Sequence, residues 1–390
     1  MKKIYLFACA TLLAFSGCTN EISEDGFVDK TNAISFNAYP TKSRAVTGDV
    51  TTDNMKADNF GVVGYTDNLI YLYKDDNKAV EQNHVASSDS WEYVNLGDLK
   101  FWPKQNMDFY AYFPYSDNAT FENSNNTGNV MTIPNVNCSH DVLFAYKGDQ
   151  EKIARVPLTF HHAFSKIQEV NVSIGNNADN KGYVKDAGVT VEIQKVEFIN
   201  TSTSGTVKVD NSGVASYTVA PTNVTLSKDL SSDVVKVHST QLTGTLIDNS
   251  TSGGYLFATN SSSSATNNVK GTGTTMWNGT NTSWAGGTTL ENLGQVCLKL
   301  TCKVWNGTEE NKYYYVGNKT TYDVMYIPLT GTSADPTNVS TFEAGKRYTY
   351  NIVFKDNVGF NVNGDPILTP ILFSVASVDV WGEVTVTITL

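Results

Sequence analysis

Cys18 is the residue whose position most clearly predicts chemistry. It follows a pair of lysines, an apolar run over residues 4–15 and the small pair Ser16-Gly17. This order is that of a secretory signal, and the apolar run is too short to span a bilayer. Small residues fit the cleft of a signal peptidase, and a Cys directly after the cut offers its thiol to diacylglycerol. We therefore predict a signal peptide at residues 1–17 and lipidation of Cys18; the alternative is a signal cut elsewhere, with Cys18 incidental.

Histidines could bind a metal or act as a general base, but the chain has only five of them. His161 and His162 are neighbours, and adjacent residues of a strand point to opposite faces, so these two cannot chelate one metal. The chain contains no Gly-x-Ser-x-Gly, no His-Glu-x-x-His and no phosphate-binding Gly-Lys-Ser/Thr loop. Residues 74–78 lack the spaced oxygen ligands and the closing Glu of a calcium loop. We therefore predict no catalytic site, no metal and no cofactor.

Three cysteines follow Cys18, an odd and sparse set that does not indicate a disulfide framework. Cys297 and Cys302 lie five residues apart, so strand alternation points them to opposite faces and they should not bond to each other. We expect Cys302 to behave as a small apolar residue. It would share a buried face with Leu298, Leu300 and Val304.

Composition excludes some classes of function. The chain of 390 residues carries a net charge of −11, without the basic patch that a nucleic-acid binder needs. Net acidity suits solubility outside the cell. No later segment has the uninterrupted apolar length of a transmembrane helix, so we expect the lipid on Cys18 to be the only membrane anchor.

Apolar and polar residues alternate with period two along much of the chain, which indicates strands. The apolar phase slips between Ile167 and Val170, which predicts a β-bulge, and a one-residue shift recurs between residues 189–193 and 196–198. Residues 206–219 are typical of a hairpin around a Gly-containing turn. Many short strands separated by Gly, Asn, Asp and Pro predict an all-β fold of sandwiches or barrels.

The length that remains after the signal peptide favours two domains. Residues 18–32 are polar and acidic without periodicity, as expected of a tether. We place an N-terminal domain at residues 33–165 and a C-terminal domain at residues 166–390, because one cluster of strands ends near residues 164–168 and the next begins there. The second domain includes a polar segment at residues 248–294, which is either partly disordered or an elaborate surface excursion.

Several stretches form a series along the chain. The signal with Cys18 and an early strand at residues 34–39 precede Lys42-Ser-Arg44-Ala45. The series continues in the stretches Phe101-Trp-Pro-Lys-Gln-Asn-Met-Asp-Phe-Tyr-Ala-Tyr-Phe-Pro114, Asp141-Val-Leu-Phe-Ala-Tyr146, Val156-Pro-Leu-Thr-Phe-His-His-Ala-Phe-Ser-Lys-Ile167, Tyr326-Ile-Pro-Leu329 and Phe342-Glu-Ala-Gly-Lys-Arg-Tyr-Thr-Tyr350. No single motif is diagnostic, but in this order, across nearly the whole chain, they resemble the fimbrillin family of Bacteroidales.

The resemblance implies two transthyretin-like Greek-key β-sandwich domains and assembly into a surface pilus with other subunits, of the same or a different kind. It also implies a cut between Arg44 and Ala45, after which an early strand leaves and a neighbour's strand fills the groove. In this chain the early strand would carry Ile34, Phe36 and Ala38 on one face. Its loss would expose an apolar groove and a row of unpaired backbone groups, which invites strand addition.

A donor strand must present apolar side chains at every second position. Val384, Val386, Ile388 and Leu390 do so, and their segment is either the donor or the last strand of the second domain. A different reading is a monomeric lipoprotein of the outer membrane and cell surface that binds a glycan or a host protein. Arg44 discriminates between the two, because a cut there frees the protein from its lipid.

Overall fold

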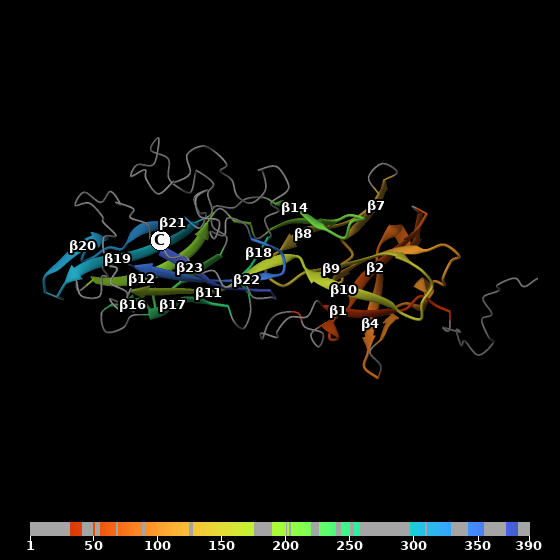
Figure 1. Ribbon diagram of the computed structural model, residues 1–390, viewed down its shortest axis with the longest axis horizontal. Coiled ribbons are helices and arrows are strands. Elements are labelled where there is room, and N and C mark those ends of the chain that lie inside the picture. Colours follow the sequence, from red (N-terminus) through yellow and green to blue (C-terminus); the bar gives the residue numbers. More distant parts are fainter. Residues whose placement is uncertain are drawn as a thin grey trace, which may run out of the picture.

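The protein is built almost entirely of β-strands arranged along one long axis (Figure 1). The computed structural model describes residues 32–40, 50, 55–67, 69–87, 90–124, 128–174, 189–199, 201–202, 204–219, 226–238, 243–249, 253–257, 297–308, 310–328, 342–354 and 372–380. Most of the first half of the sequence lies at one end of the molecule and most of the second half at the other (Figure 1). Besides the single helical residue Met55, the helical elements within the described ranges are two short 3₁₀ turns, η1 (Asp75–Asn77) and η2 (Leu96–Asp98). The predicted all-β fold is confirmed.

The first half contains an eight-stranded sheet whose ladder closes on itself. β2 pairs with β4 on one side and with β6 on the other, so the strands between them form a ring. Closure pairs each ring strand on both sides, although β1 meets β5 through the single pair Phe36 and Trp91. In hydrogen-bonding order the strands are β3 (Leu69–Leu72), β2 (Phe60–Thr66), β4 (Val80–Val85), β5 (Ser90–Tyr93), β1 (Phe36–Pro40), β10 (Val156–His162), β9 (Leu143–Gln150) and β6 (Met107–Phe113).

β2 is buried on both faces because it separates two cores. Phe60 and Val62 belong to the core inside the ring, whereas Val63 and Tyr65 belong to a second core outside it. A four-stranded sheet covers that second core. Its strands, in order, are β14 (Ala215–Val219), β13 (Ser204–Val209), β8 (Gly128–Asn137) and β7 (Thr120–Ser124).

The second half packs two further sheets around one core. Val170 and Ile352 contribute to this core from one sheet, and Val191 and Leu300 contribute from the other. One sheet contains β17 (Thr243–Asp248), β11 (Phe164–Ile174), β22 (Lys346–Phe354) and β23 (Leu372–Val380), with β18 (Tyr255–Phe257) also paired to β11. The other contains β15 (Leu226–Asp229), β12 (Val189–Ile199), β19 (Cys297–Gly307) and β20 (Lys312–Val316), with β16 (Val235–Val237) on β12 and β21 (Asp323–Pro328) on β19. These packed sheets agree with the predicted sandwich architecture.

Several local predictions are confirmed. The register of β11 against β22 shifts after Ile167, and the register of β12 against β19 shifts after Ile193, where the apolar phase slips in the sequence. The predicted hairpin at residues 206–219 is β13 and β14. Cys302 is buried in the core with the apolar residues on its face of β19, and burial raises the pKa of its thiol above the usual range.

The hairpin β13–β14 comes from the second half of the sequence but adds to the sheet of the first half, because β13 pairs with β8. Val207 and Tyr217 of the hairpin are buried in one core cluster with Tyr110 of β6. Tyr255 and Phe257 of β18 belong to the same cluster. The domain boundary between residues 165 and 166 remains a prediction. Residues from both sides of this boundary pack in one core cluster.

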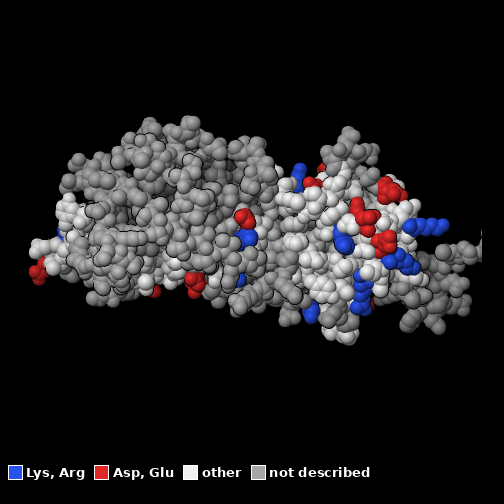
Figure 2. Space-filling model, viewed as in Figure 1, with Lys and Arg blue, Asp and Glu red and all other residues white. Residues whose placement is uncertain are grey.

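Charged side chains are spread over the surface. On the face shown in Figure 2, Lys and Arg of the first half lie among Asp and Glu, without a large patch of one sign. Of the residues that the structure describes, none belongs to a helix long and apolar enough to cross a membrane.

Replacing Val207 by Ala should lower the free energy of unfolding by about 2 kcal/mol, because it leaves a cavity in the core under the four-stranded sheet. Urea denaturation measures this change, and hydrogen exchange should show weaker protection in β6 and β8. Lys208→Ala is the matched control on the exposed face of the same strand and should change stability by no more than about 0.5 kcal/mol. Equal effects of the two substitutions would show that the hairpin does not support the first half.

Candidate functional site

β1 carries Phe36 and Ala38 of the residues predicted to be released, and Ile34 lies two positions before it; β1 is one strand of the ring. It pairs in parallel with β10 over five residues, and on its other side Phe36 pairs with Trp91 of β5. Ile34, Phe36 and Ala38 have exposed fractions of 0%, 0% and 4%, and all three belong to the core inside the ring. Tyr39 points away from this core and is 43% exposed. Strand alternation therefore places the three predicted residues on the buried face of β1.

Phe36 occupies a site with aromatic walls. Its ring stands edge-on to those of Phe60 and Phe109, with centroids 6.2 and 5.6 Å away and interplanar angles of 86° and 81°. Phe60 in turn contacts the rings of Trp91 and Phe160, at 4.9 and 5.4 Å. Edge-to-face pairs of this kind add to the free energy gained from burial. Phe36 thus fits a site made by β2 and β6, the two strands on the opposite side of the ring.

The residues just before β1 are fastened to two loops. The backbone N–H of Ile34 donates to the carbonyl of Lys100 at 2.9 Å. The N–H of Val156 donates to the carbonyl of Ser35 at 2.8 Å, and Ser35 Oγ donates to the carbonyl of Ala154 at 2.7 Å. These bonds hold the chain in register before the parallel ladder with β10 begins.

Removing β1 would open the ring between β5 and β10. The edges of both strands would lose their pairing, and the inner core would face water along a groove the length of β1. Burial of Ile34 and Phe36 contributes about 1.5–3 kcal/mol each, so the strand stays in place unless another strand replaces it. By geometry, the space that β1 fills is a binding site for a β-strand.

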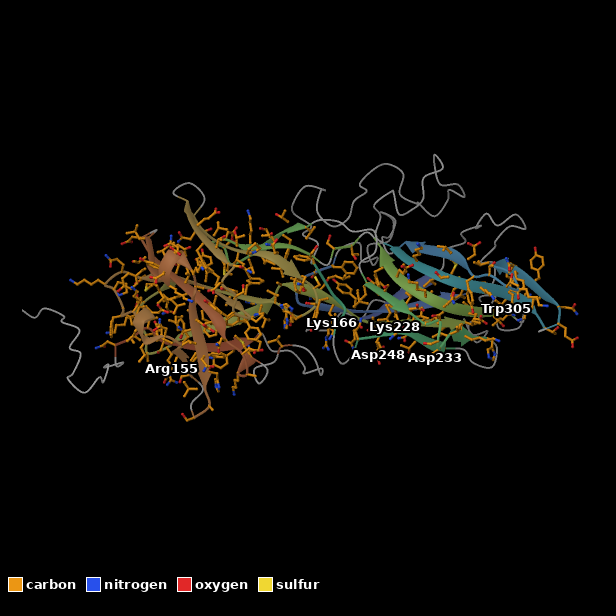
Figure 3. All side chains as sticks on the ribbon, turned by 180° about the vertical axis from the view of Figure 1, so that it is seen from behind. Arg155, Lys166, Lys228, Asp233, Asp248 and Trp305 are labelled. Carbon is orange, nitrogen blue, oxygen red and sulfur yellow. The ribbon has the colours of Figure 1, made fainter. Side chains whose placement is uncertain are left out.

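The other predicted site residues lie outside the described part of the chain, so they are not placed relative to β1. They are Cys18, Arg44, Ala45, Val384, Val386, Ile388 and Leu390. The chain has two arginines besides Arg44. Arg155 is exposed in the loop before β10 (Figure 3), whereas Arg347 is buried within β22.

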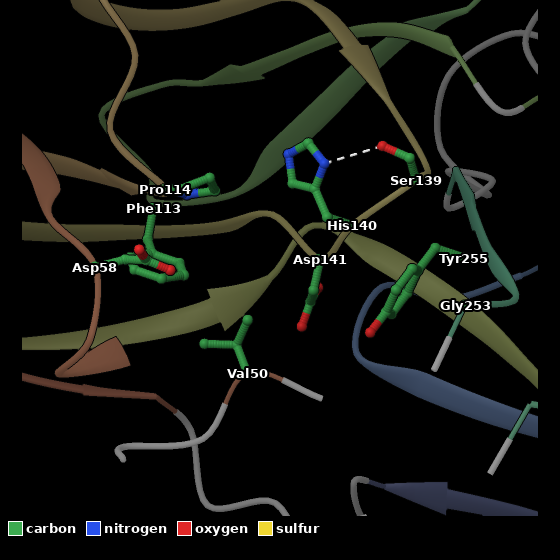
Figure 4. A pocket seen from close by; sticks show the side chains of 9 residues that line it. All are labelled: Val50, Asp58, Phe113, Pro114, Ser139, His140, Asp141, Gly253 and Tyr255. Atoms are coloured by element: carbon green, nitrogen blue, oxygen red, sulfur yellow. Dashed lines mark hydrogen bonds between the residues drawn. The ribbon is translucent and has the colours of Figure 1, made fainter. Parts of the chain in front are cut away.

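A pocket of 440 Å³ lies where the two halves meet (Figure 4). Within it, Ser139 Oγ lies 3.0 Å from His140 Nδ1, whereas Asp141 Oδ2 lies 2.6 Å from Nδ1 of a different histidine, His162. A Ser-His-Asp triad needs a single imidazole between the hydroxyl and the carboxylate, so these residues do not form one. The pocket is lined by Val50, Asp58, Phe113, Pro114, Ser139, His140, Asp141, Gly253 and Tyr255.

The two adjacent histidines face opposite ways, as predicted. His161 is on the outer face of β10, where partial burial and then the neighbouring His162 lower its pKa. His162 is buried and bonded to Asp141, and both side chains are 1% exposed. Within the described ranges, no three side chains of His, Cys, Asp or Glu lie close enough to hold a metal ion.

Sequence reasoning did not find the residues that form the site of Phe36. Phe60, Trp91 and Phe109 come from three strands that the chain separates by many residues, so no local pattern joins them. A signal was present in residues 60–65 and 107–113, whose apolar runs break strict alternation. Such runs are typical of strands that are buried on both faces.

Phe36→Ala should lower the free energy of unfolding by about 3–5 kcal/mol, because it empties an aromatic site in the inner core. Tyr39→Ala removes an aromatic side chain from the outer face of the same strand and serves as the control. Urea denaturation of the two variants makes the comparison. A loss no greater for Phe36→Ala than for Tyr39→Ala would mean that β1 is not an integral strand of the ring.

Comparisons with known proteins agree with the resemblance seen in the sequence. No curated protein matches the chain. Among solved structures, the chain is similar to a fimbrial protein from Bacteroides vulgatus, with 17% identity, a TM-score of 0.46, and coverage of 84% of this chain and 96% of that one. It is also similar to a fimbrilin from Porphyromonas gingivalis W83, with 12% identity, a TM-score of 0.40, and coverage of 88% and 95%. Residues 43–260, more than half of the chain, match the fimbrillin-like family, and the chain therefore belongs to that family.

Proposed function

We propose that this protein is a structural or adhesive subunit of a bacterial surface pilus. It is exported as a lipoprotein precursor, cut after Arg44 and polymerised by strand exchange. The observation that carries the proposal is the position of β1, a short strand near the start of the chain that completes the inner core of the first half. Membership of the fimbrillin-like family supports a pilus or adhesin role at the cell surface.

Before the cut, β1 fills its own groove. The ring is closed by β1, so the edge of β10 and the inner core are covered during export. Covalent attachment adds to this protection, because a tethered strand has a high effective concentration at its site. The precursor therefore stays a monomer while it carries its lipid.

One cut would remove both the lipid and the covalent hold on β1. Cys18 and β1 lie on the same side of Arg44, and Arg44 follows Pro40, the last residue of β1, by four positions. After cleavage β1 is held only by burial and hydrogen bonds, so a strand from a neighbouring subunit can compete for the groove. In return, the segment with Val384, Val386, Ile388 and Leu390 would serve as the donor to a neighbour.

A second function is favoured by the pocket between the two halves. A monomeric surface lipoprotein that binds a glycan or a host protein would use a cavity of this size, which combines apolar walls with the polar side chains of Asp58 and His140. Such a protein would keep its lipid and the segment before Arg44. The N-terminal residue of the protein on the cell surface separates the two functions.

Lipidation is tested by labelling cells with a fatty-acid analogue. The wild-type precursor should incorporate the label and Cys18→Ala should not, because the acceptor thiol is lost. Cys302→Ala is the control for a cysteine removed elsewhere, since that thiol is buried in the folded core. Label in the Cys18→Ala protein equal to the wild type would rule out this lipid site.

Cleavage is tested by N-terminal sequencing of the protein isolated from the cell surface. Wild type should begin at Ala45, and Arg44→Ala should keep its lipid and remain outside pili. Arg155→Ala is the matched control, because Arg155 is exposed, whereas Arg347 is buried. A wild-type surface protein that still begins at Cys18 would contradict the pilus proposal and support the lipoprotein that does not polymerise.

A further inference from the structure

We propose that the groove under β1 is shaped for a strand of a different subunit rather than for residues 384–390 of a second copy of this chain. The inference rests on the proposed strand exchange, and it concerns which side chains the groove accepts. The neighbours of this protein in the pilus would then be subunits of a different kind, so the polymer would be a heteropolymer.

The groove has one wide site and one narrow site. The wide site holds the ring of Phe36 between those of Phe60 and Phe109. The narrow site holds only the methyl group of Ala38, which is 4% exposed, and the site before both holds Ile34. Protein interiors are close-packed, so each site has about the size of its present occupant. A well-fitting strand therefore carries a branched aliphatic, an aromatic and an Ala-sized residue at successive inward positions.

Residues 384–390 do not satisfy this pattern in any register. Their four apolar side chains alternate with threonines, so the apolar face is the one that can be buried. If that face fills all three sites, the Phe36 site receives Val386 or Ile388, whichever way the strand runs. The Ala38 site then receives another residue of the same set, each of which is larger than Ala.

Both mismatches weaken binding. An aliphatic side chain in the aromatic site leaves a cavity between Phe60 and Phe109. A branched side chain in the Ala38 site overpacks a closed interior and forces the strand away from β10. The reversed face would bury three threonine hydroxyls against the apolar core.

This mismatch has a consequence for assembly. After the cut, β1 remains a better occupant of its groove than the corresponding segment of a second copy, so the cleaved protein does not polymerise alone. The strand that displaces β1 comes from a subunit whose donor segment carries an aromatic residue two positions away from an Ala or Gly, on the side that the direction of the strand sets. Residues 384–390 in turn fit a groove with aliphatic sites on another subunit.

The test uses the full chain cut after Arg44, with a fluorescent peptide of residues 32–40 as the probe for the groove. Unlabelled peptides then compete, and anisotropy reports displacement. The unchanged peptide and its Tyr39→Ile variant should compete equally, because that position faces outward. The Phe36→Val and Ala38→Ile variants and a peptide of residues 383–390 should each compete at least about tenfold more weakly. Competition by residues 383–390 as strong as that of the unchanged peptide would overturn the inference.

Two further measurements test the inference even if the fluorescent peptide does not displace β1 from the groove. In the uncut chain, Ala38→Ile should lower the melting temperature, whereas the matched Tyr39→Ile should not. Equal melting temperatures of the two variants would show that the Ala38 site is not narrow and would overturn the inference. Gel filtration of the cut wild-type chain alone should show a monomer, and polymers would overturn the inference while leaving strand exchange intact. Failure of the proposed function would appear separately, as a surface protein that begins at Cys18.

Discussion

The closure of the inner ring by β1 is the constraint on which the rest of the first half depends. β5 and β10 do not pair with each other, and β1 bridges them through a parallel ladder on one side and a contact at Phe36 on the other. The aromatic cluster around Phe60 is sealed only when this bridge is in place. The strand nearest the start of the described chain is therefore also the strand that completes the core.

The shared outer core links the two halves of the molecule. A hairpin from the second half covers β8, and β18 adds Tyr255 and Phe257 to the same cluster. The buried pair of His162 and Asp141 lies at this junction, at the point where β10 gives way to β11. The two halves are therefore joined by packed side chains as well as by the continuous backbone.

The proposed strand exchange would require a segment that is held firmly yet can be replaced. Burial of Ile34 and Phe36 would supply the affinity, and it would not change if the backbone were cut after Arg44. The effective concentration of β1 at its groove would fall, because a cut would turn an intramolecular contact into one between separate chains. The sizes of the sites under β1 would then determine which competing strand binds.

The sequence by itself determined many of the strands, their buried faces and two of their bulges, because period-two alternation records which side chains meet the core. It placed Ile34, Phe36 and Ala38 on one face, and it placed Cys302 with its apolar neighbours, for the same reason. Only the tertiary structure decided which strands pair. Closure of the ring, the addition of β13 and β14 to β8, and the meeting of Phe36 with Phe109 each join residues far apart in the chain. Alternation shows that a strand has an apolar face, but it does not show which other strand packs against that face. The pairing depends on the shapes of the side chains that pack together in three dimensions.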